Sequence, residues 1–229
     1  MVIATRTKFT EQLDEVERLI RRLTDKCSSD VRAVALAAAG DRGAAEGVMA
    51  GRSGEDRLRS AIESNCLDIM LLQQPLIGDD LRFVTGSFRL VSDLSHIDGM
   101  TRDAIYLVND LPEKVTAKLG DFFSEMAERS ASMVEVASGA FCSSDVQAAQ
   151  EVFEADTAIN SLYSEVEEKL VGLIRDGRTS AQYIPELLMV AKYFERIGDL
   201  AKRVANWAIF RVTGEHDVAE KASQKTDEL

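Results

Sequence analysis

Apolar side chains recur along most of the chain at intervals of three and four residues, which is the spacing of one face of an α-helix. The first such stripe consists of Phe9, Leu13, Val16, Leu19, Ile20, Leu23, Cys27, Val31 and Val34. Runs of β-branched residues, which are typical of strands, are rare in this sequence. The pattern therefore predicts an all-α protein.

Glycine and proline residues divide the pattern into six helical segments, because both residue types end or interrupt helices. The predicted helices cover residues 5–39, 44–74, 79–109, 113–140, 145–175 and 180–212. Asp145, with Ser143 and Ser144, is expected to cap the fifth helix, and Asp79 or Asp80 to cap the third.

The last three segments repeat the apolar pattern of the first three. At offsets of 110, 104 and 100, the matches are Phe9, Leu13, Val16 and Leu23 with Leu119, Phe123, Met126 and Met133; Ala45, Val48 and Met49 with Ala149, Val152 and Phe153; and Leu90, Leu94 and Ile97 with Val190, Phe194 and Ile197. Each stripe must be buried against neighbouring helices, and short connections favour antiparallel packing. We therefore predict two tandem antiparallel three-helix bundles, repeat one (residues 1–111) and repeat two (112–214), followed by a polar flexible tail (215–229).

Composition and charge exclude several classes of protein. With 27 basic and 39 acidic residues the formal net charge is −12, and no basic face that could bind nucleic acid is evident. The longest apolar stretch, 33–39, is too short to span a membrane, and no signal peptide is recognisable, so we expect a cytoplasmic protein without membrane insertion. Cys27, Cys66 and Cys142 are odd in number and widely spaced, which predicts buried, reduced thiols.

The residues with the clearest chemical potential lie in the last helix. Glu195 and Asp199 are separated by four positions and so share a helix face, where their like charges repel. On the preceding helix, Asp156 and Asn160 have the same spacing. If the two helices pack antiparallel, these four side chains could form an oxygen-rich site for a hard or borderline cation. Gly198, between the two acids, indicates a close approach of a neighbouring helix or a ligand.

A solvated acidic face beside a tight helix crossing also explains these residues, and on their evidence alone it is the simpler interpretation; both interpretations stay open. Catalysis is the poorer hypothesis. The only histidines are His96, expected to be partly buried, and His216, and there is no Ser-His-Asp set, P-loop, GxGxxG, HExxH or paired Glu-x-x-His motif. The alternative to a non-enzymatic protein is a metal-dependent helical enzyme with carboxylate ligands.

Several motifs resemble those of the PhoU family of phosphate-uptake regulators. They are Gln73-Gln74-Pro75 followed by Asp80-Leu81-Arg82, then Phe194-Glu195-Arg196-Ile197-Gly198-Asp199, Trp207-Ala208-Ile209-Phe210 and Val212-Thr213-Gly214-Glu215. The resemblance covers about residues 5–215.

The resemblance implies a cytoplasmic, non-catalytic all-α protein, often a homodimer. Such a protein links the ATPase subunit of a phosphate ABC transporter to a phosphate-sensing histidine kinase and keeps the phosphate-starvation response off. It also implies metal binding at an ExxxD motif in each repeat. In repeat two this motif is Glu195 and Asp199, with Asp156 and Asn160 on the neighbouring helix, and the expected metal is iron, zinc or manganese.

Repeat one departs from the motif. Its corresponding residues are Ser95-His96-Ile97-Asp98-Gly99, and Arg52 and Asp56 stand where repeat two has Asp156 and Asn160. Both acidic motif positions are lost, although Asp98 lies one residue, about 100°, from the register. We therefore expect metal binding in repeat two, weakened by Asn160, and little or none in repeat one.

Overall fold

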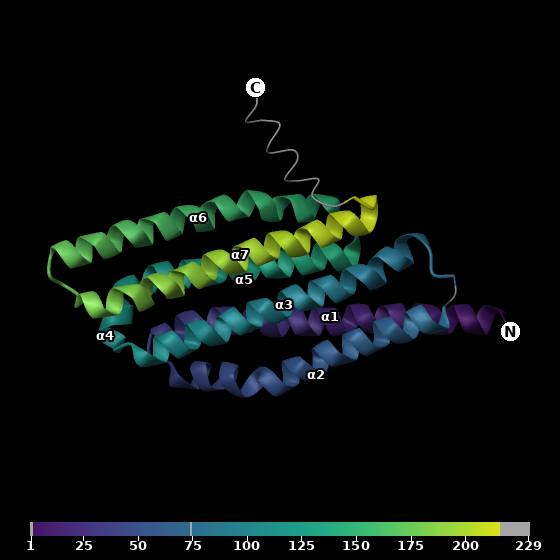
Figure 1. Cartoon of the computed structure of the whole chain (residues 1–229), viewed down its shortest axis with the longest axis horizontal. Helices are drawn as coiled ribbons and strands as arrows, with labels where there is room; N and C mark the ends of the chain where they lie inside the picture. The colour runs from purple at the N-terminus through teal and green to yellow at the C-terminus, as the bar shows by residue number, and fades with distance from the viewer. Residues whose placement is uncertain (1, 74, 216–229) are drawn as a thin grey trace, which may run out of the picture.

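The computed structural model describes residues 2–73 and 75–215, with side chains from Lys8 onward, and within these residues it is helical without a strand. The long helices are α1 (Val2–Ala38), α2 (Arg42–Leu72), α3 (Gly78–Asp110), α5 (Gly120–Ser143), α6 (Val146–Arg175) and α7 (Ile184–Thr213) (Figure 1). The all-α prediction is confirmed. The predicted tail, apart from its first residue, lies outside the described residues.

The fourth predicted helix is divided in the structure. A short helix α4 (Glu113–Thr116) and a 3-10 turn (Ala117–Leu119) precede α5, and a second 3-10 turn (Ala181–Tyr183) precedes α7. Thr116 is buried and its hydroxyl donates a hydrogen bond of 2.5 Å to the carbonyl oxygen of Ala38. This contact joins α4 to the end of α1, and it is a tertiary contact that the local sequence does not contain.

Helix ends follow the local chemistry in most places. Asp145 is the N-cap of α6 and its side chain accepts a hydrogen bond from the amide of Ala148, as predicted. Asp79 and Asp80 do not cap α3, so that prediction is wrong: α3 begins at Gly78, and both acids lie in its first turn. In that turn a carboxylate still favours the helix dipole.

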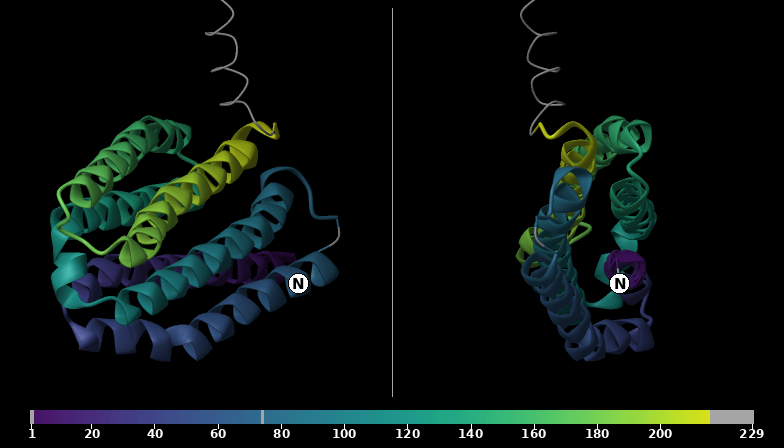
Figure 2. Two further views of the ribbon diagram at one scale, coloured as in Figure 1. Left: turned by 60° about the vertical axis from the view of Figure 1, so that its left-hand side comes forward. Right: turned by 90° about the vertical axis from the view of Figure 1, so that its right-hand side faces the viewer.

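Two trios of antiparallel helices are joined along their length. Helices α1, α2 and α3 pack on one another, as do α5, α6 and α7, while α1 packs on α5 and α3 on α7 (Figure 2). The buried core is continuous across both repeats. The predicted three-helix repeats are thus present as neighbours that share one core, and their separation into two domains at residue 111 stays a prediction.

Polar groups also cross between the repeats. Arg32 of α1 contacts Glu128 and Glu135 of α5, at 2.7 Å from Nε and 2.6 Å from Nη1. Asp93 of α3 is only 1% exposed, accepts a hydrogen bond of 3.1 Å from Nε1 of Trp207 and lies 2.8 Å from the guanidinium of Arg203. A buried carboxylate is costly unless it is paired and hydrogen-bonded, so these contacts help to fix α3 against α7.

Burial agrees with the sequence in most respects. Cys27, Cys66 and Cys142 are free and buried, as predicted, and burial raises the pKa of the Cys66 and Cys142 thiols to about 12. His96 is exposed, so the expectation of partial burial was wrong. None of the described helices holds an apolar stretch long enough to cross a membrane.

Candidate functional site

The repeat-two cluster (Asp156, Asn160, Glu195 and Asp199) lies where α6 and α7 cross. Asp156 and Asp199 contact the same side chain, because Nζ of Lys202 lies 2.7 Å from Oδ2 of Asp156 and 2.8 Å from Oδ1 of Asp199. Asn160 donates a hydrogen bond of 3.0 Å from Nδ2 to Oδ2 of Asp156. The structure thus brings three of the four predicted residues together, around a lysine that the sequence analysis did not single out.

Glu195 is held by a different lysine. Its Oε2 lies 2.7 Å from Nζ of Lys192, one turn earlier on α7. No direct contact joins Glu195 to Asp156 or Asp199 among the described contacts. Glu195 therefore shares the helix face of Asp199, as its spacing predicts, but its charge is balanced separately.

Gly198 explains why the two helices can lie so close. A Cβ atom at this position would lie 3.3 Å from Cδ1 of Ile159 and 3.5 Å from Oδ1 of Asp156. The close approach predicted from Gly198 is that of helix α6. Asp156 is only 7% exposed, and its Oδ1 accepts no hydrogen bond, so one buried carboxylate oxygen is left for a further partner.

The charge of Lys202 is maintained by its neighbours. Burial alone would lower the pKa of this ammonium group, but hydrogen bonds with Asp156 and Asp199 outweigh that effect and raise the pKa. Lys202 is therefore charged at neutral pH and supplies a positive charge between the two carboxylates.

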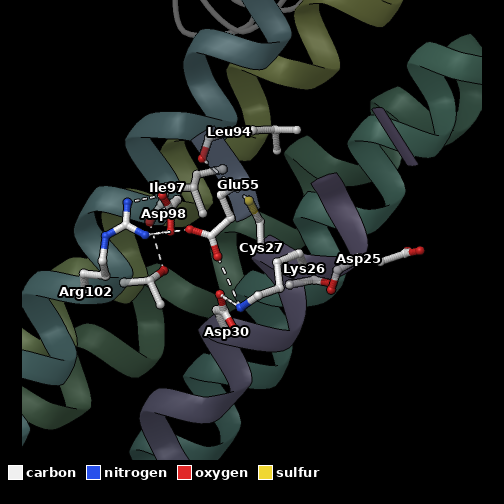
Figure 3. A network of polar contacts seen from close by, with 11 residues as sticks. Asp25, Lys26, Cys27, Asp30, Glu55, Leu94, Ile97, Asp98 and Arg102 are labelled. Atoms are coloured by element: carbon white, nitrogen blue, oxygen red, sulfur yellow. Dashed lines mark hydrogen bonds and ion pairs between the residues drawn. The ribbon is translucent and has the colours of Figure 1, made fainter. Parts of the chain in front are cut away.

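A second acidic cluster occupies the interior of repeat one. We define the repeat-one cluster as Asp30 of α1, Glu55 of α2 and Asp98 of α3, all buried, whose carboxylate oxygens lie within 4.8 Å of one another (Figure 3). A metal ion could be held at such a spacing. Two cations are already present: Arg102 pairs with Asp98 and, at 2.6 Å, with Glu55, and Lys26 pairs with Asp30 and lies 3.2 Å from Oε1 of Glu55.

The three carboxyl groups of the repeat-one cluster differ in their pKa values. Burial and the neighbouring charge of Glu55 raise the pKa of Asp98 to about 7 and that of Asp30 to about 6. Burial also acts to raise the pKa of Glu55, but its hydrogen bonds with Asp98, Asp30, Arg102 and Lys26 outweigh this and lower the pKa to about 2. Glu55 therefore holds the charge, while Asp98 and Asp30 take up protons near neutral pH.

The repeat correspondence shows how the two clusters differ. At the offsets of 104 and 100, Glu55 and Asp98 stand where repeat two has Ile159 and Gly198. Arg52 and Asp56, at the positions of Asp156 and Asn160, are exposed. In repeat one, Glu55 and Asp98 thus lie one position away from the register of the repeat-two cluster, and both are buried.

The sequence did contain a signal for part of the repeat-one cluster. Glu55 follows Val48 by seven residues and precedes Ile62 by seven, so it occupies a buried position of the α2 stripe. An acid on an apolar stripe requires a partner. Lys26 and Asp30, and Asp98 and Arg102, are also pairs at i and i+4.

Comparison with known proteins shows similarity to PhoU proteins. The PhoU domain family model matches residues 123–208. A phosphate-specific transport system accessory protein PhoU homolog from Aquifex aeolicus is 29% identical over 209 residues, which cover 90% of each chain. PhoU homolog 1 of Mycobacterium tuberculosis is 27% identical over 220 residues, covering 91% of this chain and 95% of the relative.

Solved structures share the fold. The PhoU structure from Streptococcus pneumoniae superposes with a TM-score of 0.79 at 24% identity, over 91% of this chain and 98% of the other. PhoU from Pseudomonas aeruginosa has a TM-score of 0.71 at 21% identity, over 94% and 100%. The chain thus matches the PhoU domain within repeat two, is similar to PhoU homologs along both repeats and shares the fold of solved PhoU structures.

Proposed function

We propose that this protein is a cytoplasmic negative regulator of phosphate uptake. It acts as an adaptor between the ATPase subunit of a phosphate ABC transporter and a phosphate-sensing histidine kinase, and it keeps the phosphate-starvation response off. The observation that carries the proposal is the match to relatives named phosphate-specific transport system accessory proteins over about nine-tenths of each chain. Because the match covers both repeats, it supports a role like that of the whole relatives and not of a single repeat.

The architecture suits an adaptor. The two trios share one core, so surfaces on opposite repeats are held at a fixed distance and two partners can be presented to each other. The net charge of −12 favours partners with basic surfaces over nucleic acid. We propose that the adaptor works as a homodimer and without catalysis.

Affinity capture from cells tests the adaptor role. Tagged protein is expected to recover the transporter ATPase subunit and the histidine kinase from cells grown in high phosphate. In cells that lack the protein, phosphate-starvation genes are expected to be expressed even when phosphate is plentiful. Mass spectrometry of the captured proteins and transcript measurement provide the two results. Recovery of neither partner, together with normal repression in the deleted strain, would refute the proposal.

We also propose that the repeat-two cluster binds iron, zinc or manganese. Asp156, Glu195 and Asp199 supply carboxylate oxygens, and Asn160, which donates its Nδ2 to Asp156, retains its amide oxygen as a ligand. The support is the unpartnered buried Oδ1 of Asp156 beside Gly198. A bound ion would hold α6 to α7 by electrostatic attraction to the carboxylates of both helices. This is a structural function that requires no catalysis.

Metal loading tests this assignment. Protein stripped with a chelator and reloaded is expected to take up Mn²⁺, Zn²⁺ or Fe²⁺, and the double variant Glu195→Ala, Asp199→Ala is expected to lose that uptake, because half of the ligand set is removed. Elemental analysis after desalting measures it. Undiminished uptake by the double variant would place the metal elsewhere. Turnover that depends on the metal would instead favour the alternative of a carboxylate-liganded enzyme.

A further inference from the structure

One side chain occupies the space between the carboxylates of the repeat-two cluster. Lys202 is 26% exposed, and its ammonium group lies within 2.8 Å of carboxylate oxygens from both α6 and α7. Asp156 is only 7% exposed, and burying a carboxylate is strongly disfavoured unless it is paired with a positive group. The lysine thus already supplies the charge that a metal ion would supply.

Repeat one has a cation at the corresponding position. The offset of 100 that relates α3 to α7 places Arg102 opposite Lys202. Arg102 also joins two helices, because it contacts Glu55 of α2 and Asp98 of α3. Each of the two acidic clusters, built from acids at different positions, therefore contains a cation from the equivalent place of its repeat, in addition to Lys26 in repeat one and Lys192 in repeat two.

The two cations differ in how readily they can leave. Arg102 is 15% exposed, contacts two buried carboxylates and carries a planar guanidinium that keeps its proton. Lys202 is more exposed, and its flexible stem can carry a single point charge out to solvent. Asp199, one of its two partners, is itself about half exposed.

We propose that Lys202 is a displaceable internal counter-cation, which holds α6 to α7 in the metal-free protein and competes with the metal ion for Asp156 and Asp199. Arg102 is its permanent counterpart, and it keeps the repeat-one cluster closed to metal. This inference deepens the proposed metal site and rests on it for the competition. The role of Lys202 in the metal-free protein does not depend on that site.

The variant Lys202→Met tests the structural role of Lys202 and its competition with the metal ion separately. Lys169→Met is the matched control. Lys169 is an exposed lysine of α6 without an ion pair among the described contacts, so its loss changes the net charge equally. In chelator, Lys202→Met is expected to melt at a clearly lower temperature than the control. By calorimetric titration with Mn²⁺ or Zn²⁺ it is expected to bind at least about tenfold more tightly, since a repelling charge has been removed.

Each outcome has a defined meaning. If the wild type binds metal and Lys202→Met binds it no more tightly than Lys169→Met, competition is refuted while the metal site stands. If neither binds metal, the metal site fails, and the melting temperature in chelator alone decides the structural role. Equal melting temperatures of Lys202→Met and Lys169→Met would overturn that role. Should Lys202→Met not fold, Lys202→Gln, which keeps a hydrogen-bond donor but no charge, undergoes the same measurements.

Discussion

Replacement of Arg102 by methionine is expected to lower the free energy of unfolding by about 3–5 kcal/mol, the range found when one partner of a buried ion pair is removed. Arg102 contacts Glu55 and Asp98, which are both buried, and no other cation contacts Asp98 among the described ion pairs. Methionine fills much of the space but leaves Glu55 with only Lys26. Chemical denaturation at pH 7 measures the loss.

The loss is expected to increase with pH. The folded-state pKa of Asp98, raised to about 7, exceeds its value of 3.8 in the unfolded chain, so this group favours folding at low pH and the benefit is lost as the pH rises through 7. Without Arg102 the folded-state pKa of Asp98 rises further. Arg102→Met should therefore be more destabilised, relative to wild type, at pH 8 than at pH 5.

Arg59→Met provides the control. Among the described ion pairs Arg59 contacts only Glu63, along the exposed side of α2, and surface pairs of this kind contribute about 0.5 kcal/mol or less. An Arg102→Met variant no less stable than Arg59→Met would show that the repeat-one cluster does not depend on its arginine. A loss that is the same at pH 5 and pH 8 would contradict the role assigned to Asp98.

Alanine at Gly86 and at Gly99, two glycines of the same helix α3, is expected to change stability in opposite directions. A Cβ at Gly86 would lie 2.8 Å from Cε2 of Phe141, a fully buried ring stacked on Phe83. Such overpacking costs about 1–3 kcal/mol, which exceeds the gain of up to about 1 kcal/mol from replacing a helical glycine. A Cβ at Gly99 meets no atom within 4 Å, so only the gain applies.

Denaturation midpoints of the two variants test this pair directly. Gly86→Ala is expected to be less stable than the wild type and Gly99→Ala to be more stable. Because Phe141 belongs to repeat two, the penalty at Gly86 reports on the packing between repeats. A stabilised Gly86→Ala variant would mean that Phe141 can move, and that the two trios meet less tightly than the structure indicates.

Most helix boundaries could be predicted because they depend on neighbouring residues. Asp145 caps α6, and Gly214, with a φ of +78°, ends α7 as expected of a residue that adopts the left-handed region easily. The break between α4 and α5 was not predicted, and there Thr116 contacts the distant Ala38, which the local sequence does not reveal.

The candidate sites show the same division. The spacing of Glu195 and Asp199 places both on one helix face, and the structure adds Asp156 of α6 through Lys202. The repeat-one cluster was missed, because Asp30, Glu55 and Asp98 lie on three helices. Their i and i+4 partners are visible in the sequence, but which pairs share a buried space depends on how the helices are rotated.

The sequence by itself determined the class of fold, the repeat, the positions of most helices and the faces they bury, because apolar periodicity and end-capping residues act over one or two helical turns. Only the tertiary structure decided which faces meet. It joined α1 to α5 and α3 to α7 in one core, and it placed Lys202 and Arg102 among the acids. The physical reason is that many arrangements of amphipathic helices bury similar amounts of apolar surface. Close approaches such as those at Gly86 and Gly198, and the pairing of buried charges, select one of these arrangements.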